Sequence, residues 1–252
     1  MGILEALAIA MAGVAAGTIN TIVGSGTLIT FPTLLAFGVP PVTANASNTI
    51  GLVPGSLSGA WGYRRELRGQ RARVVRLGLA SLVGGTVGAV LLLVLPADAF
   101  ERIVPALIAL GVLLVLLGPR VSRWVARRHG DTVGQRPDAR WVTPAAAASG
   151  VYGGYFGAAQ GVILMGILGI GVDDSIQRLN AVKNVAAGLV NAVAGLIFAV
   201  VADVDWMVVA LIAVGAVVGG QIGASYGRRL PPNVLRAVIV IVGVVALLSF
   251  AV

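Results

Sequence analysis

The sequence predicts an all-α, polytopic integral membrane protein with two inverted-topology repeats, each a broken helix or hairpin followed by three transmembrane helices. Of the 252 residues, 58% are hydrophobic and 11% are charged, whereas a soluble domain carries about 25% charged residues. The apolar residues form successive stretches of about 20, the length that a helix needs to cross roughly 30 Å of hydrocarbon. The second half of the chain also repeats the first at a constant offset.

The first half begins with an apolar segment at residues 3–37, which is too long for one crossing and short for two. Gly-Ser-Gly-Thr at residues 24–27 interrupts it, which predicts a broken helix or a hairpin that returns to its starting side. No basic residue precedes the apolar run, so we expect a membrane segment and not a signal peptide. Three full crossings are predicted next, at residues 42–63, 74–95 and 100–118.

The second half has the same order of segments. An apolar segment at residues 144–170 is interrupted by Gly-Ala-Ala-Gln-Gly at residues 157–161, which predicts the second broken helix or hairpin. Three full crossings are predicted after it, at residues 176–202, 206–226 and 233–250. The sequence leaves open whether the two broken segments span the membrane or re-enter it.

An offset of 135 residues aligns the two halves without a gap over most of their length. The aligned pairs include Gly26 with Gly161, Asn45 with Asn180, Asn48 with Lys183, Thr49 with Asn184, Ser56 with Asn191 and Pro96 with Pro231. The polar pairs are the stronger evidence, because glycine is common throughout this chain. Duplicated halves of this kind are typical of secondary transporters.

The charge of the loops predicts how the halves are inserted. Arginines cluster at residues 64–76 and 120–140, so both segments should be cytoplasmic, where they contact lipid headgroups and not nucleic acid. The repeat aligns the basic residues 64–73 with the acidic loop that contains Asp203 and Asp205. Equivalent loops therefore carry opposite charge, which predicts opposite orientations for the halves. The predicted units are residues 1–118, a cytoplasmic basic linker at 119–141, and residues 142–252, with both termini outside.

The residues that the chain lacks exclude several kinds of chemistry. It has no cysteine, and its one histidine, His129, lies in an arginine-rich polar segment, so no metal site and no cofactor is expected. No carboxylate lies in the middle of a predicted crossing, and capping accounts for at least one of Asp173 and Asp174 before the helix at 176–202. Without a Walker motif, or a nucleophile with its base, we expect neither ATP hydrolysis nor another enzymatic activity.

Polar side chains inside the predicted crossings are the candidate binding residues, because they are costly in a membrane unless they have a partner. Lys183, the only lysine, lies about two turns inside the helix at 176–202. Helical spacing and the repeat define two matching polar faces, one with Asn180, Lys183, Asn184 and Asn191 and the other with Asn45, Asn48, Thr49 and Ser56. The ammonium of Lys183 needs an anion, a carbonyl cluster or a carboxylate, and a transported anion is the partner that we favour.

The two interruptions complete the predicted site. Ser25, Gly26 and Thr27, with Gln160 and Gly161 in the second half, stand where helices start, and backbone N–H groups at a helix N-terminus bind anions. In this hypothesis Lys183 neutralises an anion, the amides and hydroxyls of both faces donate hydrogen bonds, and the interruptions close the site. The simpler alternative is that the Asn, Ser and Thr side chains only join helices by hydrogen bonds.

A series of short motifs follows the same order. It comprises Gly-Ser-Gly-Thr at 24–27, Pro32, Gly-Val-Pro-Pro at 38–41 and Ala-Asn-Ala-Ser-Asn at 44–48, then Gln160-Gly161 and Asn-Ala-Val-Lys-Asn at 180–184. This series resembles the sulfite exporter TauE/SafE family over nearly the whole chain. The resemblance implies a bacterial inner-membrane transporter of sulfur-containing anions such as sulfite, sulfonates or related oxyanions. Gly-Ser-Gly stands where members of the family often have a longer glycine run, which leaves the exact substrate open.

The resulting prediction is a secondary transporter, with export the expected direction, that moves small sulfur-containing anions by alternating access across the bacterial inner membrane. A channel-like facilitator of small neutral or anionic solutes is the alternative, and a membrane enzyme or a non-transporting scaffold is disfavoured. Faces with small residues four apart, such as Gly84 with Gly88 and Gly219 with Gly223, indicate helix packing. The expected partners are the anion and the bilayer, with a homodimer as a further expectation from exposed faces of small residues.

Overall fold

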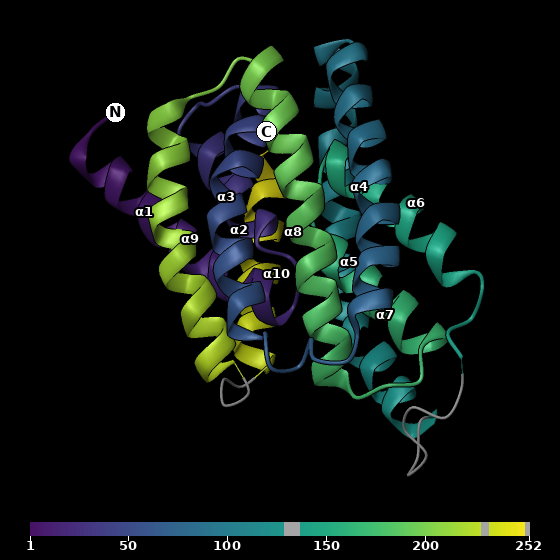
Figure 1. The fold of residues 1–252 in the computed structure, drawn as a ribbon. Helices are drawn as coiled ribbons and strands as arrows, with labels where there is room; N and C mark the ends of the chain where they lie inside the picture. Colours follow the sequence, from purple (N-terminus) through teal and green to yellow (C-terminus); the bar gives the residue numbers. More distant parts are fainter. Residues whose placement is uncertain (129–136, 228–231, 250–252) are drawn as a thin grey trace.

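Ten α-helices account for most of the residues that the computed structural model describes, which are 1–128, 137–227 and 232–249 (Figure 1). The helices are α1 Ile3–Ile22, α2 Thr27–Ala36, α3 Pro41–Gly62, α4 Arg71–Val94, α5 Ala97–Arg128, α6 Val142–Tyr155, α7 Gln160–Gly171, α8 Ile176–Val201, α9 Trp206–Tyr226 and α10 Pro232–Ser249. These ranges contain no strand. The prediction of an all-α fold is confirmed.

Four of the six predicted full crossings coincide with long apolar helices, α4, α5, α8 and α9, whereas the predicted crossing at 233–250 contains a shorter apolar stretch, Leu235–Leu248. Over the described ranges, five helices are long and apolar enough to cross a membrane: α1, α4, Ala97–Arg120 of α5, α8 and α9. The 22-residue α3 is not among them, because amides and hydroxyls such as Asn45, Asn48 and Ser56 occupy its buried face. At about 1.5 Å per residue, α3 still has the length of a crossing.

Both interrupted segments are broken helices. In the first, residues 23–26 separate α1 from the ten-residue α2, and in the second, residues 156–159 separate α6 from the 12-residue α7. Helices of these lengths extend about 15 to 18 Å, which is roughly half of a hydrocarbon core. The backbone is left-handed at two positions of the breaks related by the offset, Gly24 and Ala159, with φ angles of +88° and +61°. The left-handed conformation is unfavourable for alanine, so the surrounding structure has to enforce it.

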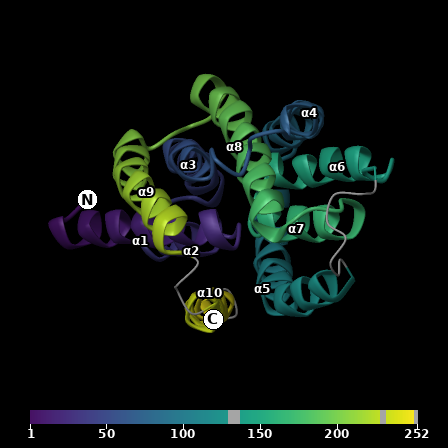
Figure 2. The same ribbon diagram turned by 60° about the horizontal axis from the view of Figure 1, so that its bottom comes forward.

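The packing interlocks the two halves. Helices α3 and α8 lie side by side in the middle of the bundle, with α9 against α3 and α4 against α8 (Figure 2). The first helix of each half then packs on a helix of the other half, α1 on α9 and α6 on α4. These two contacts are related by the 135-residue offset. The opposite membrane orientation of the halves remains a prediction.

Glycines allow these exchanged helices to approach at backbone distance. A Cβ added to Gly84 or Gly88 of α4 would overlap backbone atoms of α6, and one added to Gly219 of α9 would overlap the carbonyl of Val14 in α1. The prediction that these glycines serve packing is confirmed. These glycines pack against helices of the same chain, so they do not form the exposed faces of small residues from which a homodimer is predicted.

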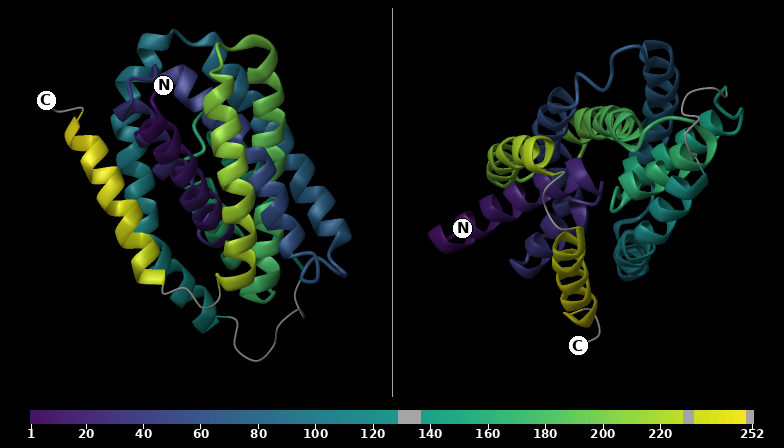
Figure 3. Two further views of the ribbon diagram at one scale, coloured as in Figure 1. Left: turned by 90° about the vertical axis from the view of Figure 1, so that its left-hand side faces the viewer. Right: turned by 90° about the horizontal axis from the view of Figure 1, so that it is seen from below.

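Helices α5 and α10 lie at the edge of the bundle, where α10 packs against α5 and α2 (Figure 3). Helix α5 continues to Arg128, so the first part of the segment predicted as a linker, 119–141, is helical. Residues 129–136, which include His129, lie outside the described residues.

Candidate substrate site at two broken helices

The two helix breaks, which are far apart in the sequence, touch one another. The backbone N–H of Gly161, at the start of α7, donates to the carbonyl of Gly24, just after α1, at 2.9 Å. A Cβ on either glycine would overlap the backbone of the other, so this contact requires glycine on both sides. Gly26 approaches the Ala16 carbonyl of α1 equally closely. The contact brings the predicted interruptions into one buried region.

Two side chains of this region have polar atoms without a partner. Ser25 is 1% exposed and Gln160 is 3% exposed, and these residues occupy equivalent positions in the repeat. Neither Ser25 Oγ nor Gln160 Nε2 has a hydrogen-bond partner within the described structure. An unsatisfied buried polar group costs about 1 to 3 kcal/mol. Such groups in a folded protein call for an explanation, and a ligand or a bound water is the usual one.

Lys183 is completely buried, and it is the only charged side chain in the core among those that the structure describes. Its Nζ donates to the backbone carbonyls of Asn20 and Thr21 at 3.1 and 3.2 Å. The Thr21 carbonyl also accepts from the side-chain amides of Asn180 at 3.2 Å and Asn184 at 3.3 Å. These carbonyls form the last turn of α1, the negative end of its dipole. Of the three kinds of partner considered for Lys183, the structure shows the carbonyl cluster.

The matching polar face of α3 contacts the end of α6, the first helix of the second broken segment. Asn45, the equivalent of Asn180, is completely buried and donates from Nδ2 to the carbonyl of Tyr155, the last residue of α6, at 3.0 Å. Each of these asparagines thus binds the end of the first helix of the opposite half. Asn48, the equivalent of Lys183, instead faces α2, where it donates to Thr27 Oγ1 at 3.3 Å and accepts from Thr30.

The two polar faces also meet directly. Asn191 Nδ2 donates to Ser56 Oγ at 3.3 Å, and these two residues are themselves equivalent in the repeat. Contact between equivalent residues is what the predicted inverted repeat would produce where its two halves meet. Thr49 is buried on the same helix as Ser56. The predicted site residues lie in α3, in α8, at the first break or in the first turns of α2 and α7.

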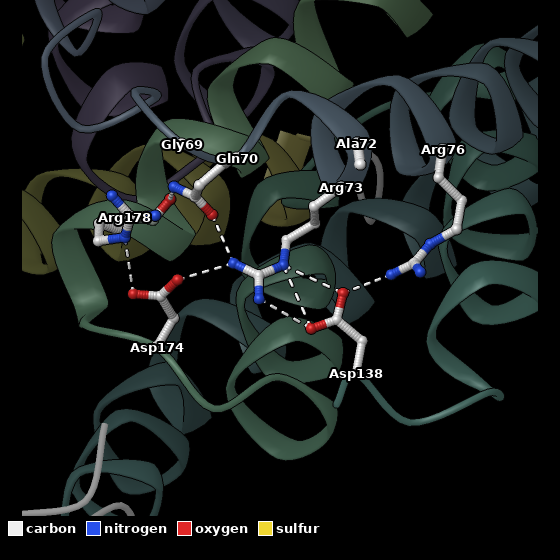
Figure 4. A pocket seen from close by; sticks show the side chains of 8 residues that line it. All are labelled: Gly69, Gln70, Ala72, Arg73, Arg76, Asp138, Asp174 and Arg178. Carbon is white, nitrogen blue, oxygen red and sulfur yellow. Dashed lines mark hydrogen bonds and ion pairs between the residues drawn. The ribbon is translucent and has the colours of Figure 1, made fainter. Parts of the chain in front are cut away.

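A second polar group lies at the end of the molecule that carries the basic loops. Figure 4 shows Arg73 between two carboxylates, with Nη2 at 2.8 Å from Asp138 and Nη1 at 2.7 Å from Asp174. Arg178 pairs with Asp174 at 2.8 Å, and Arg76 pairs with Asp138. These residues, the charged cluster, line a cavity of about 600 Å³. They join the start of α4 to the segment before α6 and to the turn before α8.

The ion pairs of the charged cluster lower the pKa of Asp138, and the two aspartates before α8 do not cap that helix. Burial by itself raises the pKa of Asp138, but hydrogen bonds and ion pairs with Arg73 and Arg76 outweigh it and lower this pKa below its usual value. The sequence predicts that at least one of Asp173 and Asp174 caps α8, but the N-cap residue is neither of them. Ser175 is the cap, since its Oγ accepts from the N–H of Arg178, while Asp174 accepts from the N–H of Ser175 and forms ion pairs.

The chain matches the family model described as Sulfite exporter TauE/SafE over residues 9–250. It belongs to the TauE/SafE family. This agrees with the resemblance read from the sequence, and it makes the chain a multi-pass membrane protein of a transporter family, which is not a class of enzymes.

Curated relatives of this TauE/SafE protein cover most of its length. It is 27% identical over 236 residues to a probable membrane transporter protein, ORF9, of Sinorhizobium sp, covering 91% of this chain and 85% of the relative. It is 28% identical over 238 residues to YfcA of Escherichia coli (strain K12), a probable membrane transporter protein, covering 91% and 83%. YdhB of Bacillus subtilis (strain 168), with the same description, is 26% identical over 228 residues, covering 88% and 89%. No solved structure matches the chain.

Two parts of this TauE/SafE structure were not foreseen. The carbonyls of Asn20 and Thr21 were missed, although Asn20 is a polar residue inside the first apolar stretch and so could have been noticed. The sequence does not predict that Asp138 and Asp174 bind Arg73, because both lie far from it in the sequence and clustered arginines indicate membrane topology.

Proposed function

We propose that the protein is a secondary transporter that exports small sulfur-containing anions, such as sulfite or organosulfonates, across the bacterial inner membrane by alternating access. Membership in a family described by sulfite export supports the substrate class. The observation that carries the proposal is the contact of two helix breaks beside buried, unpartnered atoms of Ser25 and Gln160. Broken helices that meet between repeats are the typical location of a substrate site in secondary transporters.

The chemistry of the breaks suits an oxyanion. The Ser25 hydroxyl and the Gln160 amide can each donate a hydrogen bond, and helices α2 and α7 begin at these breaks with the positive ends of their dipoles. Sulfite and sulfonates present three oxygen acceptors around one sulfur, which several converging donors can satisfy. Lys183 adds a positive charge to this region while it stabilises the end of α1. The anion crosses the membrane chemically unchanged.

The charged cluster closes the cytoplasmic side in this proposal. It ties α4 of the first half to Asp138, in the linker just before α6, and to Asp174 in the second half, so the halves cannot separate at this end while the ion pairs persist. Alternating access requires such a closure on one side at a time. When the pairs open, Arg73, Arg76 and Arg178 would face an anion that enters from the cytoplasm.

The test is uptake of ³⁵S-labelled sulfite, and of a small labelled sulfonate, into proteoliposomes. We expect saturable flux that Ser25→Ala and Gln160→Leu each reduce at least tenfold. Ser149→Ala is the matched control, because Ser149 is also a buried serine with an unpartnered hydroxyl but lies in α6 against α4. Flux that both break variants leave unchanged would contradict the proposed site. Flux without saturation or counterflow would instead identify a channel-like facilitator.

A further inference from the structure

The two broken helices end in similar ways but differ in charge. At the end of α1, the ammonium of Lys183 and the amide of Asn180 bind the last carbonyls. At the end of α6, the amide of Asn45 binds the carbonyl of Tyr155. The position equivalent to Lys183 is the neutral Asn48, which is engaged with α2. The end of α1 is therefore neutralised by the ammonium of Lys183. The end of α6 receives only the neutral amide of Asn45, because Asn48 is engaged elsewhere.

This difference matters because a helix C-terminus carries roughly half a negative charge. Water does not screen that charge inside a membrane protein as it does at a surface. The end of α1 shows how this chain compensates it, by placing a monovalent positive charge within hydrogen-bond distance of the last carbonyls. The end of α6 is also buried, since Phe156, the next residue, is in the core.

A second observation points to a ligand at the end of α6. Asn45 is completely buried, and its Oδ1 has no hydrogen-bond partner among the described residues. Because Nδ2 of the same planar amide contacts the Tyr155 carbonyl at 3.0 Å, Oδ1 lies beside the helix end as well. The hydroxyl of Tyr155 is also buried without a partner. Asn45 Oδ1 and the Tyr155 carbonyl are pure acceptors, so they can bind a cation or a hydrogen-bond donor and repel an anion.

We propose that the C-terminal end of α6 is a binding site for a monovalent cation, Na⁺, with Asn45 Oδ1 and the backbone carbonyl of Tyr155 among its ligands. Neutral oxygens and the C-terminal ends of interrupted helices are the ligands that bind Na⁺ in secondary transporters. The described residues contain no group of His, Cys, Asp and Glu side chains for a transition metal or another multivalent ion. In this site Na⁺ neutralises the negative C-terminal end of α6, as Lys183 neutralises that of α1.

The ion would connect this site to transport. The end of α6 is joined to the start of α7 by residues 156–159, and Gln160 follows immediately. A cation there places a positive charge beside the second break, as Lys183 does beside the first. The anion would then face one positive charge from each half only when Na⁺ is bound. This coupling rests on the proposed function, whereas the cation site does not.

The site is tested without any sulfur anion, by thermal unfolding of the purified protein in detergent. Melting temperatures are compared in NaCl and in choline chloride at equal ionic strength. Saturating Na⁺ should raise the melting temperature of the wild type by about 5 °C. Asn45→Ala should abolish this rise. Asn180→Ala is the matched control, since it removes the equivalent amide at the helix end that Lys183 neutralises, and the rise should persist.

A variant that introduces a lysine provides a second test of the cation site. Asn48→Lys places a lysine at the position equivalent to Lys183, so its melting temperature should no longer respond to Na⁺. If this variant does not fold, the comparison of Asn45→Ala with Asn180→Ala decides. Equal melting of the wild type in Na⁺ and choline would overturn the site, and so would a Na⁺ response that survives Asn45→Ala. Sulfite flux without a Na⁺ response would refute this inference alone, and a Na⁺ response without flux would refute the proposed function alone.

Discussion

Replacing Lys183 by methionine separates the charge of this side chain from its volume. The substitution removes two charge-assisted hydrogen bonds, to the carbonyls of Asn20 and Thr21, each of which contributes about 1.5 to 3 kcal/mol. It also removes the desolvation cost of a completely buried ammonium, which amounts to several kcal/mol. The lost hydrogen bonds and the removed desolvation cost have opposite effects on stability. The Thr21 carbonyl also still accepts hydrogen bonds from the amides of Asn180 and Asn184. We therefore expect Lys183→Met to lose no more than about 2 kcal/mol of unfolding free energy.

Lys183→Ala provides the contrast, because it removes the volume as well as the charge. Truncation of a long buried side chain to alanine costs about 2 to 5 kcal/mol through the cavity that remains. The two variants should thus differ in stability, measured by chemical unfolding followed through tryptophan fluorescence, but both should lose anion flux in proteoliposomes. Lys183→Met with wild-type flux would refute the reasoning, since the positive charge would then not be needed for transport.

Two further predictions concern the glycine contact and the charged cluster. Gly161→Ala should lower the unfolding free energy by at least about 3 kcal/mol, because its Cβ would overlap the backbone of Gly24. Gly38→Ala is the control. Gly38 also has a positive φ, of 77°, but it has open space around it, so this substitution should cost only about 1 to 2 kcal/mol in the same unfolding assay. Equal losses in the two variants would contradict the close contact. The stability that ionised Asp138 contributes should be complete above its ordinary pKa of about 4 and fall as the pH drops through its lowered folded-state pKa. The difference in melting temperature between wild type and Asp138→Asn should therefore be constant from about pH 8 to pH 5 and shrink below about pH 4, and a difference that grows with acidification would be incompatible with these ion pairs.

Local features of the sequence determined the helices and their interruptions. A helix that crosses a membrane needs about 20 apolar residues, and this requirement acts within one segment. The predicted crossing at 206–226 accordingly coincides with α9, Trp206–Tyr226. The breaks could also be read locally, from small and polar residues inside apolar stretches. The repeat relates positions such as Asn45 and Asn180, and the motifs around them indicate the family from the sequence alone.

Only the tertiary structure decided what these residues contact. Lys183 was expected to meet an anion, but its Nζ binds carbonyls of α1 that lie more than 160 residues away in the sequence. Every residue has a backbone carbonyl, so nothing in a sequence distinguishes those at a helix end that another helix approaches. The pairing of Arg73 with Asp138 depends in the same way on how the halves pack. The composition of each segment fixes its helix, whereas a polar group takes as its partner whichever group the packing of distant segments brings within reach.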